Sequence, residues 1–194
     1  MKKLIQIRIV HTPSDMGSMK EGLEKESMEK VGRQRWDENQ RKIAKFWDEV
    51  ESELDGLNLD YNKVRIYQDG LPCGGELGER IVRETADKGS RNYQIIGKLM
   101  GWGAIIEATE SPELLLKEFE YIKAMVNAAT EKEKIDAALR YDRMKDKLIE
   151  SRDTFIAKAI GATLKDGEIG LLFIGAAHNV LPKLPDDIEA MSLD

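Results

Sequence analysis

The side chains best suited to chemistry in this sequence are its two histidines, His11 and His178. Histidine is the side chain that ordinarily changes charge near neutral pH, and it is also a common metal ligand. His11 follows an apolar segment at residues 3–10, and His178 comes shortly after another at residues 169–174. Both segments are rich in the β-branched residues typical of strands, so each histidine is predicted to lie just past the end of a strand.

Two carboxylates occupy similar positions in the sequence. Asp69 comes directly after a predicted strand at residues 63–67 and its flanking glutamine, and Glu110 follows another at residues 104–108. In an open parallel α/β sheet, ligands bind in the crevice outside the carboxyl ends of the strands. The sequence therefore predicts that four side chains converge at one edge of the sheet: His11, Asp69, Glu110 and His178.

The predicted cluster fits two kinds of chemistry. Two imidazoles with one or two carboxylates are enough to hold a divalent metal ion and to leave a position open for water. Water bound to such an ion becomes a nucleophile near neutral pH, which is the basis of metal-dependent hydrolysis. The same groups could also work without a metal, as a general acid and a general base.

Polar neighbours of the two histidines are candidates for substrate binding. Ser14 and Asp15 follow His11, and Asn179 follows His178. A structural explanation competes with each functional one, because polar residues are common wherever a strand returns to solvent. Asp69 before Gly70 is also a turn-former, and Glu110 brings favourable charge to the start of a helix.

Helical periodicity between the predicted strands determines the fold class. The segment at 169–174 is apolar on both faces, which is typical of a central strand in a parallel sheet covered on both sides. Four strands that alternate with helices predict an α/β fold with a mostly parallel sheet of four or slightly more strands, flanked by long helices, in a single domain over residues 1–194.

The region from residue 112 to residue 160 is predicted to be almost entirely helical. Ser111 is placed to cap one helix, with Pro112 at its first position, and the residues from Thr130 to Glu133 form a capping box for the next. An apolar stripe then continues to Ile160. These helices could extend beyond a small domain and pair with a second copy, so we expect a homo-oligomer.

Composition limits the classes of partner and the compartment. The chain carries 36 acidic and 30 basic side chains, a formal charge of −6, which argues against binding to nucleic acid. Its single cysteine excludes a disulfide framework and suits a reducing compartment. No secretory signal and no apolar run long enough to span a bilayer is evident, so we expect a cytoplasmic protein with no membrane partner.

The last part of the chain resembles a known group of proteins. A helical Arg152-Asp153 pair, an apolar strand and then Gly175-Ala-Ala-His178 is similar to the C-terminal part of the TraB/TIKI-like group, in a clan with ChaN-like and erythromycin-esterase-like proteins. The resemblance covers mainly residues 150–180, and the strand that ends at His11 looks like a second copy of the histidine motif. It implies an α/β fold whose site is built from histidine and acidic residues, and some members are thought to be metal-dependent hydrolases or proteases.

The leading hypothesis is a metal-dependent hydrolase that acts on a small molecule or a peptide. His11 and His178 would be ligands or acid/base groups, Asp69 and Glu110 carboxylate ligands, and Arg152 a clamp for an anion or the substrate. The alternative is a non-enzymatic protein that self-associates or binds a partner through its long helices. A weaker third hypothesis is a phosphate or nucleotide binder that uses the glycine-rich loop at residues 74–78.

Overall fold

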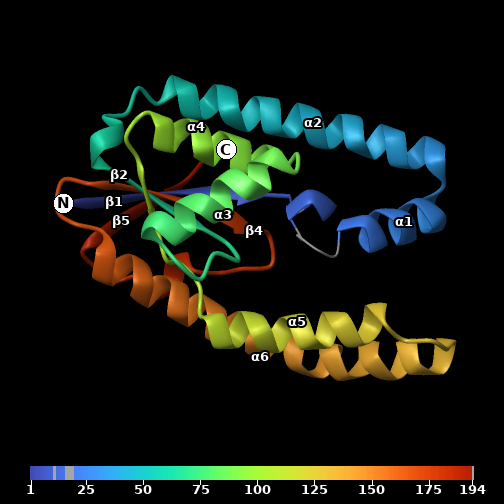
Figure 1. Cartoon of the computed structure of the whole chain (residues 1–194). Helices are drawn as coiled ribbons and strands as arrows, with labels where there is room; N and C mark the ends of the chain where they lie inside the picture. Colours follow the sequence, from blue (N-terminus) through green and yellow to red (C-terminus); the bar gives the residue numbers. More distant parts are fainter. Residues whose placement is uncertain (11, 16–19, 194) are drawn as a thin grey trace.

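The structure, a computed structural model, describes residues 1–10, 12–15 and 20–193, and they form an α/β fold around a parallel sheet (Figure 1). This confirms the fold class predicted from the sequence. In the described residues the sheet has five strands in the order β3-β2-β4-β1-β5, and every pair is parallel. The strands are β1 (Lys2–Ile9), β2 (Val64–Gln68), β3 (Ile105–Glu107), β4 (Ile169–Gly175) and β5 (Ile188–Ser192).

The helices occur between the strands, as the periodicity predicts. The α-helices are α1 (Lys20–Val31), α2 (Arg33–Gly56), α3 (Gly75–Asp87), α4 (Arg91–Gly101), α5 (Pro112–Val126) and α6 (Glu131–Thr163), and the short 3-10 helices include η2 (Tyr61–Lys63) and η3 (Leu181–Lys183). Ser111 caps α5, and the capping box at Thr130 and Glu133 forms as predicted at the start of α6. Each cap satisfies backbone N–H groups that have no partner inside the helix.

The centre of the sheet is β4, which is buried along nearly its whole length. Its side chains alternate between two hydrophobic cores, as the geometry of a strand requires. Leu171 and Phe173 join the core beneath α2, α3 and α4, whereas Leu172 and Ile174 join the core beneath the C-terminal half of α6. The sheet therefore has helices on both faces, which explains why the β4 segment is apolar without interruption.

The strand order creates a crevice between β2 and β4. The chain leaves β2 toward β3 on one side, and it leaves β4 toward β5 on the other side, across β1. Neighbouring strands whose outgoing connections run in opposite directions leave space between their loops, and ligands of open α/β sheets bind there. Asp69 follows β2 and His178 follows β4, so this crevice brings the two residues toward each other.

Two helical pairs extend past the carboxyl ends of the strands. Figure 1 shows α1 with α2 on one side and α5 with α6 on the other, both reaching in the direction in which the strands run. The helices α5 and α6 pack against each other and include residues 112–160, where a helical extension is predicted. Of these helices, α5 and α6 supply residues that line the pocket at the strand ends.

The loop after β2 is held close to β3 by glycines. A Cβ at Gly78 would lie 2.6 Å from the carbonyl oxygen of Cys73, and one at Gly74 would lie 3.0 Å from the backbone of Ile106 and Ala108. Close backbone contact therefore explains both glycines.

In the part of the chain that the structure describes, no helix is long and apolar enough to cross a membrane.

Candidate functional site

The ends of β2 and β4 open into a pocket of about 670 Å³. Asp69, Arg152 and His178 form its polar end, and α5 and α6 supply much of the remaining wall. A volume between about 300 and 1,000 Å³ is typical of sites that bind small molecules. His11 lies outside the described residues, so its expected place in this site stays a prediction.

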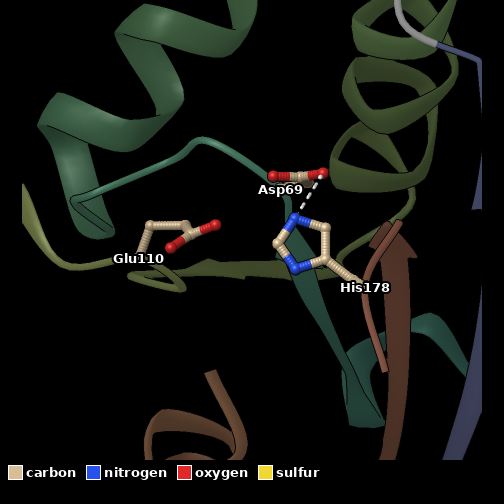
Figure 2. Close-up of side chains that lie close together, drawn as sticks. All are labelled: Asp69, Glu110 and His178. Atoms are coloured by element: carbon tan, nitrogen blue, oxygen red, sulfur yellow. Dashed lines mark ion pairs between the residues drawn. The ribbon is translucent and has the colours of Figure 1, made fainter. Parts of the chain in front are cut away.

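Three of the four side chains expected to converge do lie together. Asp69, Glu110 and His178 each offer a ligand atom, and these atoms lie within 4.8 Å of one another. Figure 2 shows the three side chains facing one another from three different segments of the chain. All three are almost completely buried. They converge because each follows a strand of one parallel sheet, at the edge where the carboxyl ends meet.

The His178 ring lies between two carboxylates. Its Nδ1 is 2.6 Å from Oδ1 of Asp153, and its Nε2 is 3.5 Å from Oδ2 of Asp69 (Figure 2). An ionised carboxylate only accepts hydrogen bonds, so we assign the ring proton to Nδ1. In a neutral ring Nε2 is then an acceptor, and it faces Asp69 at the polar end of the pocket.

Backbone contacts fix the turn that carries His178. The N–H of Asn179 donates to Oδ2 of Asp153, and the N–H of Gly175 donates to Oδ2 of Asp69. Arg8 on β1 donates from Nη1 to the carbonyl oxygen of His178 at 2.9 Å. The orientation of the histidine ring is therefore set by side chains from β1, α6 and the loop after β2.

Arg152 links the carboxylates of the site. Its Nη2 donates to Oδ1 of Asp69 at 2.6 Å, and its Nε donates to Oε1 of Glu110 at 3.1 Å. Its Nη1 donates to Glu118 on α5. These bonds use four of the five guanidinium N–H groups, so an incoming anion would meet carboxylates at all three nitrogens. The expected role of Arg152 as a clamp for an anion or the substrate stays a prediction.

Burial and charge shift the pKa values of the linked groups. Burial raises the pKa of the Glu110 carboxyl above its ordinary 4.5, against the opposing hydrogen bond and charge of Arg152. Burial acts to lower the pKa of Arg152. Its hydrogen bond to Glu110 and the charges of the surrounding carboxylates outweigh burial, so the pKa is raised overall. Arg152 therefore stays charged, whereas burial favours the protonated form of Glu110.

One oxygen of Glu110 lacks a partner. Its Oε1 accepts from Arg152, but its Oε2 is buried and has no hydrogen-bond partner among the described residues. A buried polar atom without a partner costs about 1–3 kcal/mol, and more when the group is charged. A proton or a bound cation at this oxygen would remove the penalty.

The other wall of the pocket is apolar. Leu115, Leu116, Phe119 and Ile122 line it from α5, and Ile149 lines it from α6. Tyr141 also lines the pocket and donates a hydrogen bond to Glu118. Burial raises the pKa of Tyr141 to about 12, and that hydrogen bond acts in the same direction, so the hydroxyl stays protonated.

The residues predicted to bind substrate lie in different places. Asp15 lines the pocket, where its carboxylate accepts from the Ser90 hydroxyl and from the backbone N–H of Thr12. Ser14 does not line the pocket, and Asn179 is exposed, with its backbone N–H bonded to Asp153. Contact of these three residues with a substrate stays a prediction.

Two residues of the site were not predicted. Asp153 orients His178, and Glu118 completes the set of carboxylates around Arg152. Asp153 follows Arg152 directly in the segment that carries the family resemblance, so its position next to a predicted site residue could have identified it as part of the site. Glu118 is one of many acidic residues on amphipathic helices, and no local pattern distinguishes it.

Comparison with protein-family models, with curated proteins and with solved structures finds no match for this chain. The reasoning on function therefore starts from the geometry and charge of the site itself.

Removing the charge of Arg152 should destabilise the fold. We expect Arg152→Met to lower the free energy of unfolding by about 3–5 kcal/mol, because it leaves the buried carboxylates of Asp69 and Glu110 without their shared cation. Urea denaturation followed by circular dichroism measures this. Arg143→Met, an exposed arginine on the same helix, is the control and should change stability by less than about 0.5 kcal/mol. Equal stability of the two variants would contradict the assigned role.

The pKa values of Glu110 and Glu168 are shifted in opposite directions, so their contributions to folding stability should depend on pH in opposite ways. Glu110 has a raised pKa, so its contribution to stability is fully present below its ordinary pKa and is lost as the pH rises through the folded value. Glu168 has a pKa lowered mainly by its hydrogen bond to Arg65, so its contribution is present above its ordinary pKa and is lost as the pH falls through the folded value.

Urea denaturation of the wild type and of two variants between pH 3 and pH 8 measures both pH dependences of stability. The stability difference between wild type and Glu110→Gln should shrink as the pH rises. The difference between wild type and Glu168→Gln should grow. Two curves that change in the same direction would show that burial does not control Glu110.

Proposed function

We propose that this protein is a hydrolase whose site binds a divalent metal ion through Asp69, Glu110 and His178. The observation that carries the proposal is Glu110, whose buried Oε2 has no partner among the described residues and whose carboxylate clusters with ligand atoms of Asp69 and His178. A metal ion would give this oxygen the cation that it lacks.

The spacing of the ligand atoms is consistent with one ion. Atoms bonded at about 2.1 Å to a tetrahedral ion lie about 3.4 Å apart. Nε2 of His178 and Oδ2 of Asp69 are 3.5 Å apart, close to that value. The ligand atom of Glu110 lies within 4.8 Å of the other two, so a small rotation of its side chain would complete the set. One imidazole and two carboxylates favour ions such as Zn²⁺ or Mn²⁺.

The partner of the other histidine nitrogen supports the same proposal. A metal-bound histidine usually donates its second ring N–H to a carboxylate, which fixes the ring and makes it a better ligand. Asp153 is placed to accept that hydrogen bond from Nδ1 of His178, at 2.6 Å. Nε2 is therefore the nitrogen that would bind the ion.

The chemistry of the proposed site is the addition of water across a bond of the substrate. A divalent ion lowers the pKa of its bound water to about 7, so that hydroxide forms near neutral pH. The hydroxide oxygen would attack the electrophilic carbon, and the leaving group would take up the proton that the water released. A position for water is left open because the chain supplies three ligands from its described residues.

A metal-free hydrolase is the second candidate for the same site. The hydrogen bond from Nδ1 of His178 to Asp153 leaves Nε2 as a base that points into the pocket. Such a pair can activate water without an ion. Removing metal distinguishes the two candidates, because only the metal-dependent hydrolase would then lose its activity.

Titration calorimetry with Zn²⁺ and with Mn²⁺ tests the metal site. We expect one ion per chain, and affinity at least about tenfold weaker in Glu110→Gln and His178→Gln. Asp153→Asn should weaken binding about 10- to 100-fold, because it removes the group that orients the ligand. Glu113→Gln, an exposed glutamate on the neighbouring α5, is the control and should bind like the wild type.

The outcomes of this experiment separate the candidates. No binding to the wild type, or equal binding by all variants, would reject the metal site. Hydrolysis of p-nitrophenyl acetate that persists in EDTA and is lost in His178→Gln would favour the metal-free pair. His11→Ala belongs to the same series, since a loss of affinity there would add His11 to the ligands.

Self-association through the long helices is a separate proposal that extends the homo-oligomer expected from the sequence. Val126 on α5 and Ile135 and Leu139 on α6 expose large parts of their apolar side chains. Light scattering on purified protein should give a mass of about twice 22.0 kDa if a second copy covers them. A monomer at all concentrations would contradict this proposal.

The single cysteine supports a reducing compartment such as the cytoplasm.

A further inference from the structure

The pocket combines a polar end with an unusually apolar wall. Leu115, Leu116, Phe119 and Ile122 face it from successive turns of α5, and no residue of that helix is completely buried. Leu116 is 58% exposed although it lines the pocket. Such side chains gain free energy when apolar surface covers them, at about 25 cal/mol per Å².

The charged side chains that line the pocket are mostly negative. Asp15, Asp69 and Glu118 line it, and Arg152 is the single guanidinium among the described residues that line it. Arg152 already donates to Asp69 and Glu118 within the pocket, and to Glu110 behind it. An anionic group that entered would meet carboxylates and would find the guanidinium engaged. The polar end therefore disfavours a negatively charged ligand.

We propose that the ligand of this pocket is a small amphiphile, with an apolar chain that packs on α5 and an uncharged polar group, such as an amide or ester, at the end formed by Asp69 and His178. The inference rests on the same site as the proposed hydrolase and adds the class of its substrate. An apolar chain about 10 Å long spans two turns of α5, the spacing from Leu115 to Ile122. Esters and amides of apolar acids have both required parts.

A pair of probes that differ only in charge tests this inference. Octanamide and octanoate have the same chain, and octanoate is anionic at pH 7.5. Titration calorimetry in EDTA prevents a metal ion from holding the carboxylate. We expect saturable binding of octanamide and at least tenfold weaker binding of octanoate. Equal binding of both probes, or no binding of octanamide, would overturn the inference.

Two matched leucine variants locate the binding surface. Leu116→Gln should weaken octanamide binding about fivefold, because it removes apolar surface from the pocket wall. Leu77→Gln is the control, since Leu77 is 48% exposed on α3 and does not line the pocket. Both positions are helical and exposed, so neither change should prevent folding. The same effect from both variants would overturn the assignment of the wall.

A parallel hydrolysis assay keeps this inference separate from the proposed function. Octanamide binding without cleavage of p-nitrophenyl octanoate by the Mn²⁺-loaded protein would reject the hydrolase and leave the ligand class in place. Cleavage of p-nitrophenyl acetate with no preference for the octanoate ester and no octanamide binding would reject the ligand class and leave the hydrolase.

Discussion

Arg152 is the interaction on which the rest of the site depends. It reaches from α6 to Asp69 after β2, to Glu110 after β3 and to Glu118 on α5, so one guanidinium joins four segments of the chain. Carboxylates buried this deeply would repel one another and would take up protons without a shared cation. The ion pairs therefore hold Asp69 and Glu110 close to His178, and they attach the long helix α6 to the carboxyl edge of the sheet.

The topology explains why this edge holds a site at all. The connections from β2 and β4 diverge, so the loops after them part and leave a crevice with polar residues on both sides. The helical pair α5–α6 closes one side of that crevice and brings an apolar surface next to the polar residues. A site formed only by strand ends would be open to water, whereas this one has a wall that can exclude water from a bound apolar chain.

The sequence was informative wherever a signal is local. Short segments rich in apolar residues predicted four strands, and capping residues predicted the starts of α5 and α6. It missed β5, because four of the five residues of this edge strand are exposed and show no alternation. The positions of Asp69, Glu110 and His178 after strands predicted that they would meet, but Glu118 joins them through helix packing. Strand order likewise depends on pairing between distant segments, for which no local pattern exists.

The hydrogen-bond pattern around His178 supports the proposed cation. The ring faces a carboxylate at each nitrogen, Asp153 at Nδ1 and Asp69 at Nε2, and a neutral imidazole can donate to just one of them. The second contact then joins two acceptors 3.5 Å apart. The neighbouring Glu110 has a buried Oε2 with no partner among the described residues. A proton on Nε2 would satisfy the first contact, and a proton on Oε2 would satisfy Glu110. The proposed divalent ion would bring positive charge to both. The proposed metal would therefore compete with protons for this site, and acidification should favour the protons because each ligand binds metal only when it is deprotonated.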